Sequence, residues 1–293
     1  MWEQMMDFLK SFFSYPGLKW ELLLVAIGLA IIFGAIWLCA HWPPLFKKPW
    51  LWVVAVVSAF LTLLAITFVQ IPLQWWDGQV LTHFWKSATL VTWLLLAGAP
   101  SILLSGLVQE GAKMVPMVAW WWRNGRNIDP KLGLAIGAIA GAGFGIFEAF
   151  WVHGRIFAAG WTLQALHTDG FLGIVGFWER FFAIGFHIAV SALAGYGLAK
   201  GKGWQFYLIA SGLHALLNYG VVFLQKGYFT LTQLEVYVAV VAVAVAVWAL
   251  LLRWGRWGEP EFEMPPEAPT PAGPVTGSNP VGPGGTGTNT GAV

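Results

Sequence analysis

The chain has 293 residues, of which 58% are apolar and only 10% are charged, and its net charge is +2. Soluble domains carry about 25% charged residues, so this composition excludes an ordinary soluble domain and indicates a multi-pass membrane protein whose surroundings are the lipid bilayer. The small net charge gives no reason to expect a nucleic-acid partner.

The chain begins with a segment that predicts a short interfacial helix over residues 1–17. Met5, Leu9, Phe12 and Phe13 fit one helical face, and the Pro16-Gly17 pair ends it. Long apolar runs then predict helices that cross the membrane. The clear ones are Leu18–Ala40, Trp50–Pro72, Leu132–Val152, Val175–Ala199, Trp204–Leu224 and Leu234–Leu252.

The apolar run 87–122 is too long for one crossing, because about 20 residues span a hydrocarbon core. Pro100 and Pro116 lie inside it, and proline breaks or kinks a helix. Two interpretations stay open. Either one crossing over about 100–122 follows a partial or re-entrant segment, or the run crosses twice.

Lysine and arginine in short loops predict the orientation. The basic loops are 41–49, 123–131 and 200–203, together with the residues after the last span, whereas the alternate loops carry single basic residues at Lys86, Arg155 and Lys226. This pattern places the C-terminus in the cytoplasm of a cell-membrane protein. It favours seven crossings, and an eighth is the alternative.

The sequence therefore predicts an all-α fold, a polytopic transmembrane helix bundle of seven to eight spans. Residues 18–257 form the transmembrane domain. From 258 to 293 the composition changes to proline, glycine, threonine and scattered acids, which predicts a disordered cytoplasmic tail.

Four apolar segments each carry a group that is costly in lipid, namely Glu110, Glu148, His187 and His214. A charge at the bilayer centre costs about 2.5–3.5 kcal/mol even on the mildest scale, so such groups indicate function. Counted from their own basic loops, all four lie about 15–24 Å into the membrane. Because neighbouring segments run in opposite directions, this agreement predicts one shared polar site.

The helical faces point the same way. Small residues spaced by four let helices approach closely, and Glu148 extends such a stripe, so it should face the bundle interior. The stripe is Gly133, Gly137, Gly141 and Gly145. His214 and Asn218 share a face, and Lys113 is three residues past Glu110, close enough to pair with it. His153, His167 and Asp169 are expected to be solvated loop residues.

Two carboxylates and two imidazoles allow two mechanisms of water activation. In one, Glu110 or Glu148 is a general base, His187 orients the water or protonates the leaving amine, and His214 with Asn218 donates to the oxyanion. In the other, Glu110, Glu148, His187 and His214 bind a divalent metal such as zinc. The sequence contains no His-Glu-x-x-His helix, so the version without a cofactor is favoured.

The motifs Gln109-Glu110-x-x-Lys113, Gly143-Phe144-Gly145-x-x-Glu148, Arg180 with His187 and Gly195-Tyr196-Gly197, and His214-x-x-x-Asn218 occur in this order over about 110 residues. This order resembles PrsW-type intramembrane proteases, which are related to the CAAX prenyl protease and abortive-infection group. The resemblance implies a multi-pass, glutamic-type protease, a hydrolase that cuts a single-span membrane protein such as an anti-sigma factor.

The same resemblance implies the roles of the residues. It makes Glu110 the base, Glu148, His187, His214 and Asn218 its catalytic partners, and Gln109, Lys113 and Arg180 supporting residues. Gln109 stands where the family usually has a first glutamate. Adjacent helical residues point about 100° apart, which favours Glu110 as the one that faces the site.

Two other functions fit the same buried cluster. One is a proton-coupled transporter or channel whose carboxylates relay protons, and the other is a non-catalytic protein that binds membrane partners. An inverted repeat would favour transport, and the sequence shows none.

Overall fold

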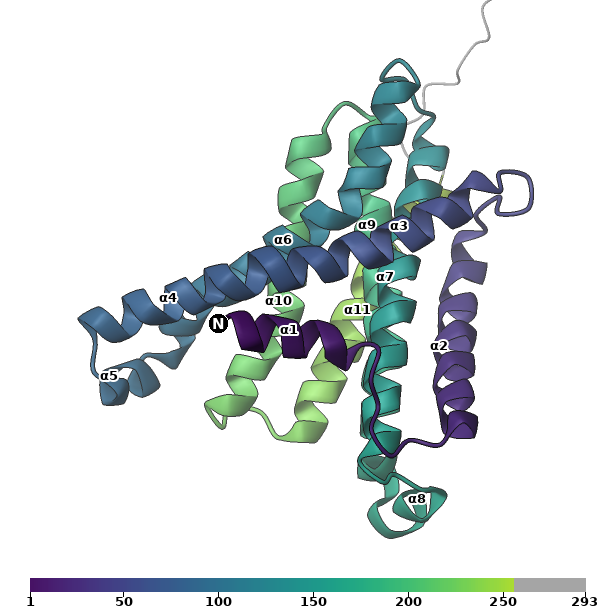
Figure 1. The fold of residues 1–293 in the computed structure, drawn as a ribbon. Coiled ribbons are helices and arrows are strands. Elements are labelled where there is room, and N and C mark those ends of the chain that lie inside the picture. Colours follow the sequence, from purple (N-terminus) through teal and green to yellow (C-terminus); the bar gives the residue numbers. More distant parts are fainter. Residues whose placement is uncertain (256–293) are drawn as a thin grey trace, which may run out of the picture. The chain divides into compact units, whose positions relative to one another are not determined.

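The computed structural model describes residues 1–255, and the regular structure in this range is entirely helical (Figure 1). Seven helical stretches within it are long and apolar enough to cross a membrane, which confirms the predicted polytopic all-α bundle. The elements are α1 Trp2–Ser11, α2 Trp20–His41, α3 Trp50–Ala65, the π-helix η1 Ile66–Gln70, α4 Ile71–Phe84, α5 Ser87–Thr92, α6 Leu94–Arg123, α7 Pro130–Ala158, α8 Leu163–Asp169, the 3₁₀-helix η2 Gly170–Ile174, α9 Val175–Ala199, α10 Gly203–Gln225 and α11 Leu231–Trp254. The predicted tail, 258–293, lies outside the described residues.

The second predicted span is longer than expected. α3, η1 and α4 continue one another over Trp50–Phe84, although a stop at Pro72 was predicted. The π-turn of η1 directly precedes Pro72. Such a turn re-aims the backbone carbonyls, which lets the helix pass a residue that has no N–H to donate. The same turn changes which faces of the helix point inward.

The ambiguous run 87–122 forms one long helix and one short one. α6 has 30 residues and contains both Pro100 and Pro116, while α5 has only six residues. Among the described residues this run therefore supplies a single candidate span, which agrees with seven crossings and leaves no eighth. The crossing starts at Leu94 rather than near residue 100.

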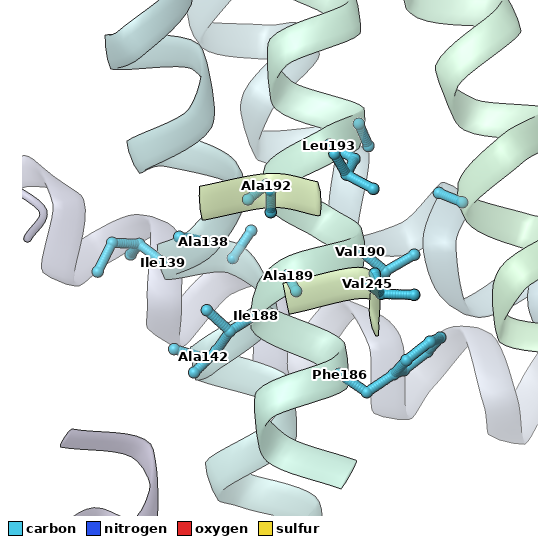
Figure 2. Packing of buried hydrophobic residues seen from close by; sticks show 14 of the residues in the cluster. Ala138, Ile139, Ala142, Phe186, Ile188, Ala189, Val190, Ala192, Leu193 and Val245 are labelled. Carbon is cyan, nitrogen blue, oxygen red and sulfur yellow. The ribbon is translucent and has the colours of Figure 1, made fainter. Parts of the chain in front are cut away.

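The centre of the bundle is the pair α7 and α9. The most apolar part of α7 is 72% buried and that of the stretch Leu163–Ala199, which ends with α9, is 83% buried, whereas that of α2 is only 17% buried and leaves most of its surface for lipid. Figure 2 shows Ala138 and Ala142 of α7 beside Ile188 and Ala189 of α9. Small side chains here allow the two helices to pack closely.

The predicted glycine stripe is the contact surface between α7 and α9. A Cβ on Gly133, Gly137 or Gly141 would lie within 2.0–2.5 Å of the carbonyl oxygen of Gly195, Ser191 or His187, respectively. No side chain fits there, so glycine at these positions sets the distance between the helices. It thereby fixes how far Glu148 on α7 stands from His187 on α9.

The predicted N-terminal helix is present but ends at Ser11, before the Pro16-Gly17 pair that was expected to end it, and it packs on the bundle. Met5 and Phe12 are buried, and the Phe12 ring stacks on Trp151 of α7 at 4.6 Å between ring centroids. Phe13 is 59% exposed and does not belong to the buried face. The position of α1 relative to a lipid interface stays a prediction.

Local signals in the sequence explain where α7 and α11 begin. Asp129 accepts a hydrogen bond from the Leu132 N–H at 2.9 Å, with Pro130 at the first helical position. Thr230 and Gln233 form a capping box at the start of α11. At the other end of α11, Arg253 donates to the His41 carbonyl oxygen at 3.0 Å and ties α11 to α2.

Candidate functional site

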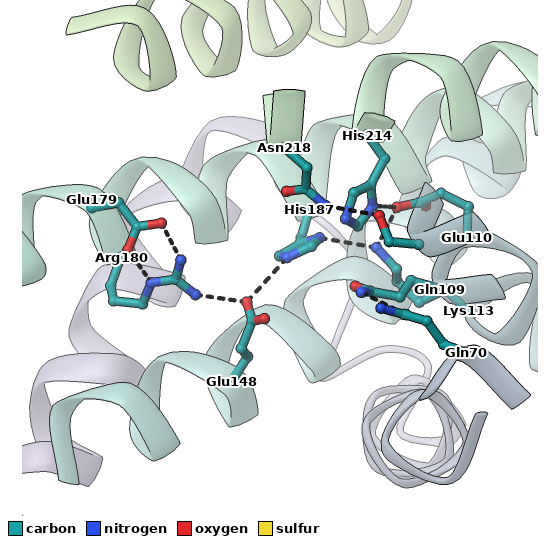
Figure 3. A network of polar contacts seen from close by, with 11 residues as sticks. Gln70, Gln109, Glu110, Lys113, Glu148, Glu179, Arg180, His187, His214 and Asn218 are labelled. Atoms are coloured by element: carbon teal, nitrogen blue, oxygen red, sulfur yellow. Dashed lines mark hydrogen bonds and ion pairs between the residues drawn. The ribbon is translucent and has the colours of Figure 1, made fainter. Parts of the chain in front are cut away.

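A fully buried ion pair on α6 forms one end of the polar site. Lys113 Nζ donates to Glu110 Oε1 at 2.5 Å, and both side chains are 0% exposed. His214 on α10 reaches the same carboxylate, with its Nδ1 at 2.6 Å from Oε1, and Ser191 Oγ donates to Oε2 at 3.3 Å. Glu110 is therefore held from three helices (Figure 3).

His187 on α9 connects this ion pair to the second carboxylate. Its Nδ1 lies 2.9 Å from Lys113 Nζ, and its Nε2 lies 3.3 Å from Glu148 Oε2. An ammonium can only donate, so Nδ1 is the acceptor and Nε2–H the donor. The network fixes one neutral tautomer of His187.

Glu148 on α7 lies in a more open environment than Glu110. Its Oε2 accepts a hydrogen bond from Arg180 Nη1 at 2.8 Å, and the side chains of Arg180 and Glu148 are 14% and 22% exposed. Arg180 also forms an ion pair with Glu179 next to it on α9. Among the described residues the hydrogen bonds and ion pairs of Glu148 are made by Oε2, which leaves Oε1 for another partner.

A cavity of about 260 Å³ adjoins the network between α6, α7, α9, α10 and α11. Its lining residues are Gln109, Glu148, Gly176, Glu179, Arg180, Ala183, His187, His214, Leu217, Asn218, Val221, Leu234, Glu235 and Val238. Glu110 and Lys113 are absent from this lining. The two carboxylates therefore differ. Glu148 lines the cavity, whereas Glu110 does not and contacts His214, which does.

Asn218, one turn after His214, lines the cavity as the shared face predicts. Its Nδ2 donates to Ser105 Oγ on α6 at 3.1 Å. An amide nitrogen carries two N–H groups, so one remains to serve a ligand in the cavity.

Gln109 corrects one expectation. The α6 network contains Glu110, as favoured, but Gln109 also faces the interior and lines the cavity. Its Nε2 donates to Gln70 Oε1 of η1 at 3.1 Å, while its own buried Oε1 has no partner among the described residues. Gln109 is therefore the member of this adjacent pair that lines the cavity, while Glu110 points into the buried network, as expected for neighbours about 100° apart on a helix.

The structure brings together every residue that the sequence proposed for the site. The four groups from separate spans form one connected network, as the prediction of one shared polar site requires, and the Glu110–Lys113 pair is present. Sequence reasoning missed Gln70 and Glu235. Gln70 is uncharged and Glu235 lies at the start of its predicted span, so the cost of a charge in mid-membrane, which singled out Glu110, does not single out these two.

One further expectation was wrong. His153 is not a solvated loop residue, because α7 continues to Ala158 and buries it completely. His167 and Asp169 are exposed on the short helix α8, as expected.

A metal would find a suitable donor set in part of the network. Glu110, His187 and His214 each offer one ligand atom, and these atoms lie within 4.8 Å of one another. However, the ammonium of Lys113 already contacts Glu110 Oε1 and His187 Nδ1. A divalent cation would have to displace it, so the residues present fit a metal only after Lys113 moves away.

Comparison of the chain with protein-family models, with curated proteins and with solved structures finds no match. The motif resemblance and the geometry of the site are therefore what supports a function.

Proposed function

We propose that this protein is an intramembrane protease of the PrsW type that hydrolyses a peptide bond of a membrane-spanning substrate. The observation that carries the proposal is the network of Glu110, Lys113, His187, His214 and Glu148 beside a cavity of about 260 Å³. Buried ionisable groups in a membrane bundle are expensive and indicate function. A cavity large enough for water and part of a substrate, lined by two imidazoles and a carboxylate, suits hydrolysis.

The geometry supports a role for Glu110 that differs from direct attack. Its carboxylate lies 2.6 Å from His214 Nδ1 and outside the cavity lining, so it orients the imidazole and stabilises its charged form. His214 Nε2 is then the atom that takes a proton from water, as in carboxylate–imidazole pairs of hydrolases. Glu110 remains necessary, but it acts through His214.

Glu148 and Asn218 complete the reaction in this scheme. Glu148 Oε1 holds the attacking water, which adds to the peptide carbonyl carbon as His214 accepts its proton. An Asn218 N–H stabilises the oxyanion, a contribution of about 3–4 kcal/mol in soluble hydrolases. The His214 imidazolium returns the proton to the leaving nitrogen, and the carbon–nitrogen bond breaks. His187 is engaged on both nitrogens and positions Glu148 and Lys113.

A metal-dependent version uses the same residues. Glu110, His187 and His214 would hold the ion once Lys113 had withdrawn. A divalent metal would lower the pKa of a bound water and polarise the substrate carbonyl. Metal analysis of the purified protein with chelator treatment tests this, since activity that survives metal removal contradicts it.

We place the protein in the cell membrane, with the basic loops and the C-terminus in the cytoplasm, on the distribution of lysine and arginine. The cavity lies toward the opposite end, where α9 and α11 begin. The substrate in this proposal is a single-span membrane protein, such as an anti-sigma factor.

The deciding experiment is co-expression with a panel of single-span membrane proteins, comparing the unaltered chain with Glu110→Gln and Glu148→Gln. Each variant should lose about 10²–10⁴-fold of its cleavage rate if it removes acid–base chemistry. Unchanged processing in both variants would contradict the proposal. Glu21→Gln, which removes an exposed acid at the start of α2, is the matched control and should cleave normally.

A further inference from the structure

The cavity lining has an excess of negative charge. Among the described lining residues, three carboxylates, Glu148, Glu179 and Glu235, accompany one guanidinium, Arg180. Arg180 forms ion pairs with Glu148 and Glu179. Among the described residues Arg180 makes no hydrogen bond or ion pair with Glu235, so its charge attracts that carboxylate only from a distance.

Glu235 on α11 is the unusual member of this group. It is 4% exposed and lines the cavity, and its Oε2 has no hydrogen-bond partner among the described residues. A carboxylate in a low-dielectric environment without a directly bonded cation costs several kcal/mol. Such a group is stabilised when a ligand brings a cation to it.

The adjoining wall indicates what kind of cation would fit. Leu217 and Val221 of α10 and Leu234 and Val238 of α11 line the same cavity. An apolar wall beside an acidic group suits a lysine or arginine side chain, whose methylene stem packs on apolar surface while its head reaches the charge. A bare inorganic cation would gain nothing from these four side chains.

We propose that Glu235, with Glu179, forms a subsite for a basic side chain of the substrate. This inference rests on the proposed protease function and adds the substrate class. Both acids line the same cavity as Glu148 and His214, so a substrate chain bound in the cavity can present a basic side chain to them.

The test uses synthetic single-span peptides whose flanking segment carries one lysine, or norleucine in its place. Norleucine keeps the stem and removes the charge. Binding is measured by fluorescence anisotropy with the full chain in lipid nanodiscs, in the Glu110→Gln/Lys113→Met background so that cleavage does not interfere. The lysine peptide should bind at least about tenfold more tightly than the norleucine peptide. Equal affinities would overturn the inference.

Protein variants then locate the subsite. Glu235→Gln should abolish the preference for lysine, whereas Glu21→Gln, an exposed acid on α2, should keep it. A preference that persists in folded Glu235→Gln overturns the inference. If that variant does not fold, a photo-reactive group placed beside the lysine decides the question: crosslinks must map to the start of α9 or α11, and crosslinks elsewhere overturn it.

Two further experiments are needed. One distinguishes a basic side chain from a free N-terminus as the source of the positive charge, and the other distinguishes failure of the subsite from failure of the protease proposal. Acetylated and free N-termini distinguish an α-amino group from the side chain, and a preference that depends on the free N-terminus alone overturns the side-chain subsite. Peptides that bind with lysine preference but are never cut by the unaltered chain contradict the protease and leave the subsite standing. Cleavage without lysine preference overturns the subsite alone.

Discussion

The two carboxylates of the site lie in contrasting environments. Glu110 is 0% exposed, contacts Lys113, His214 and Ser191, and does not line the cavity. Glu148 is 22% exposed, lines the cavity and uses one oxygen for Arg180 and His187. Two similar side chains in different environments take different roles. From residue type alone, either Glu110 or Glu148 could have been proposed as the general base.

The largest effect should come from breaking the buried pair. Glu110→Gln leaves the Lys113 ammonium without a carboxylate in the bundle interior and should cost about 3–5 kcal/mol of unfolding free energy. Glu110→Gln/Lys113→Met removes both charges and should recover most of that loss. Thermal and denaturant unfolding in detergent measures all three chains, and additive losses would contradict a coupled pair.

The second-largest effect is expected at the glycines that set the distance between α7, which carries Glu148, and α9, which carries His187. A Cβ at Gly141 would lie 2.0 Å from the His187 carbonyl oxygen, so Gly141→Ala should push α7 from α9 and cost about 1–3 kcal/mol. Gly28 on α2 has nothing within 4 Å of such a Cβ. Gly28→Ala should be neutral or stabilising by up to about 1 kcal/mol. Equal effects of the two substitutions would show that the stripe does not set the spacing.

Substitutions near Glu148, which is more exposed than Glu110, should cost less stability. Arg180→Lys keeps the charge but cannot form the guanidinium fork that contacts Glu148 and Glu179, so the loss of stability should be about 1 kcal/mol. Arg155→Lys on the exposed side of α7 is the control. If Arg180→Lys lost as much unfolding free energy as Glu110→Gln, the environments of Glu148 and Glu110 would not differ as described.

The smallest effect is expected at Ser191. Its hydroxyl donates to Glu110 Oε2 at 3.3 Å, and single hydrogen bonds inside membrane bundles average about 0.6 kcal/mol. Ser191→Ala should therefore unfold almost like the unaltered chain and retain peptide cleavage. Loss of cleavage in a folded Ser191→Ala protein would point to a serine nucleophile and against water activation.

Much of the fold and the site could be predicted because membrane chemistry is strict. Apolar length located the spans, and Val175–Ala199 matches α9 at both ends. The cost of charge in lipid singled out Glu110, Glu148 and the two histidines, and helical spacing gave the Glu110–Lys113 pair.

What the sequence did not reveal depends on local geometry. The π-turn of η1 carries the helix past Pro72 and brings Gln70 to Gln109, and no periodicity announces such a turn. Glu235 lies at the start of a span, where an acid normally meets the interface, and only the cavity shows that it is buried. The proposed division of roles between Glu110 and Glu148 depends on which of the two lines the cavity beside His214, and the sequence does not show this.

The placement of Lys113 has a consequence for biogenesis. Glu110 and Lys113 are three residues apart on α6, so this helix carries its own counter-ion and can enter the bilayer as an internally neutralised segment. Glu148 on α7 instead depends on Arg180 of α9, which is synthesised later. α7 must therefore accommodate an unpaired acid until α9 inserts. We expect the translocon to release α6 readily and to retain α7 until its partner helix arrives.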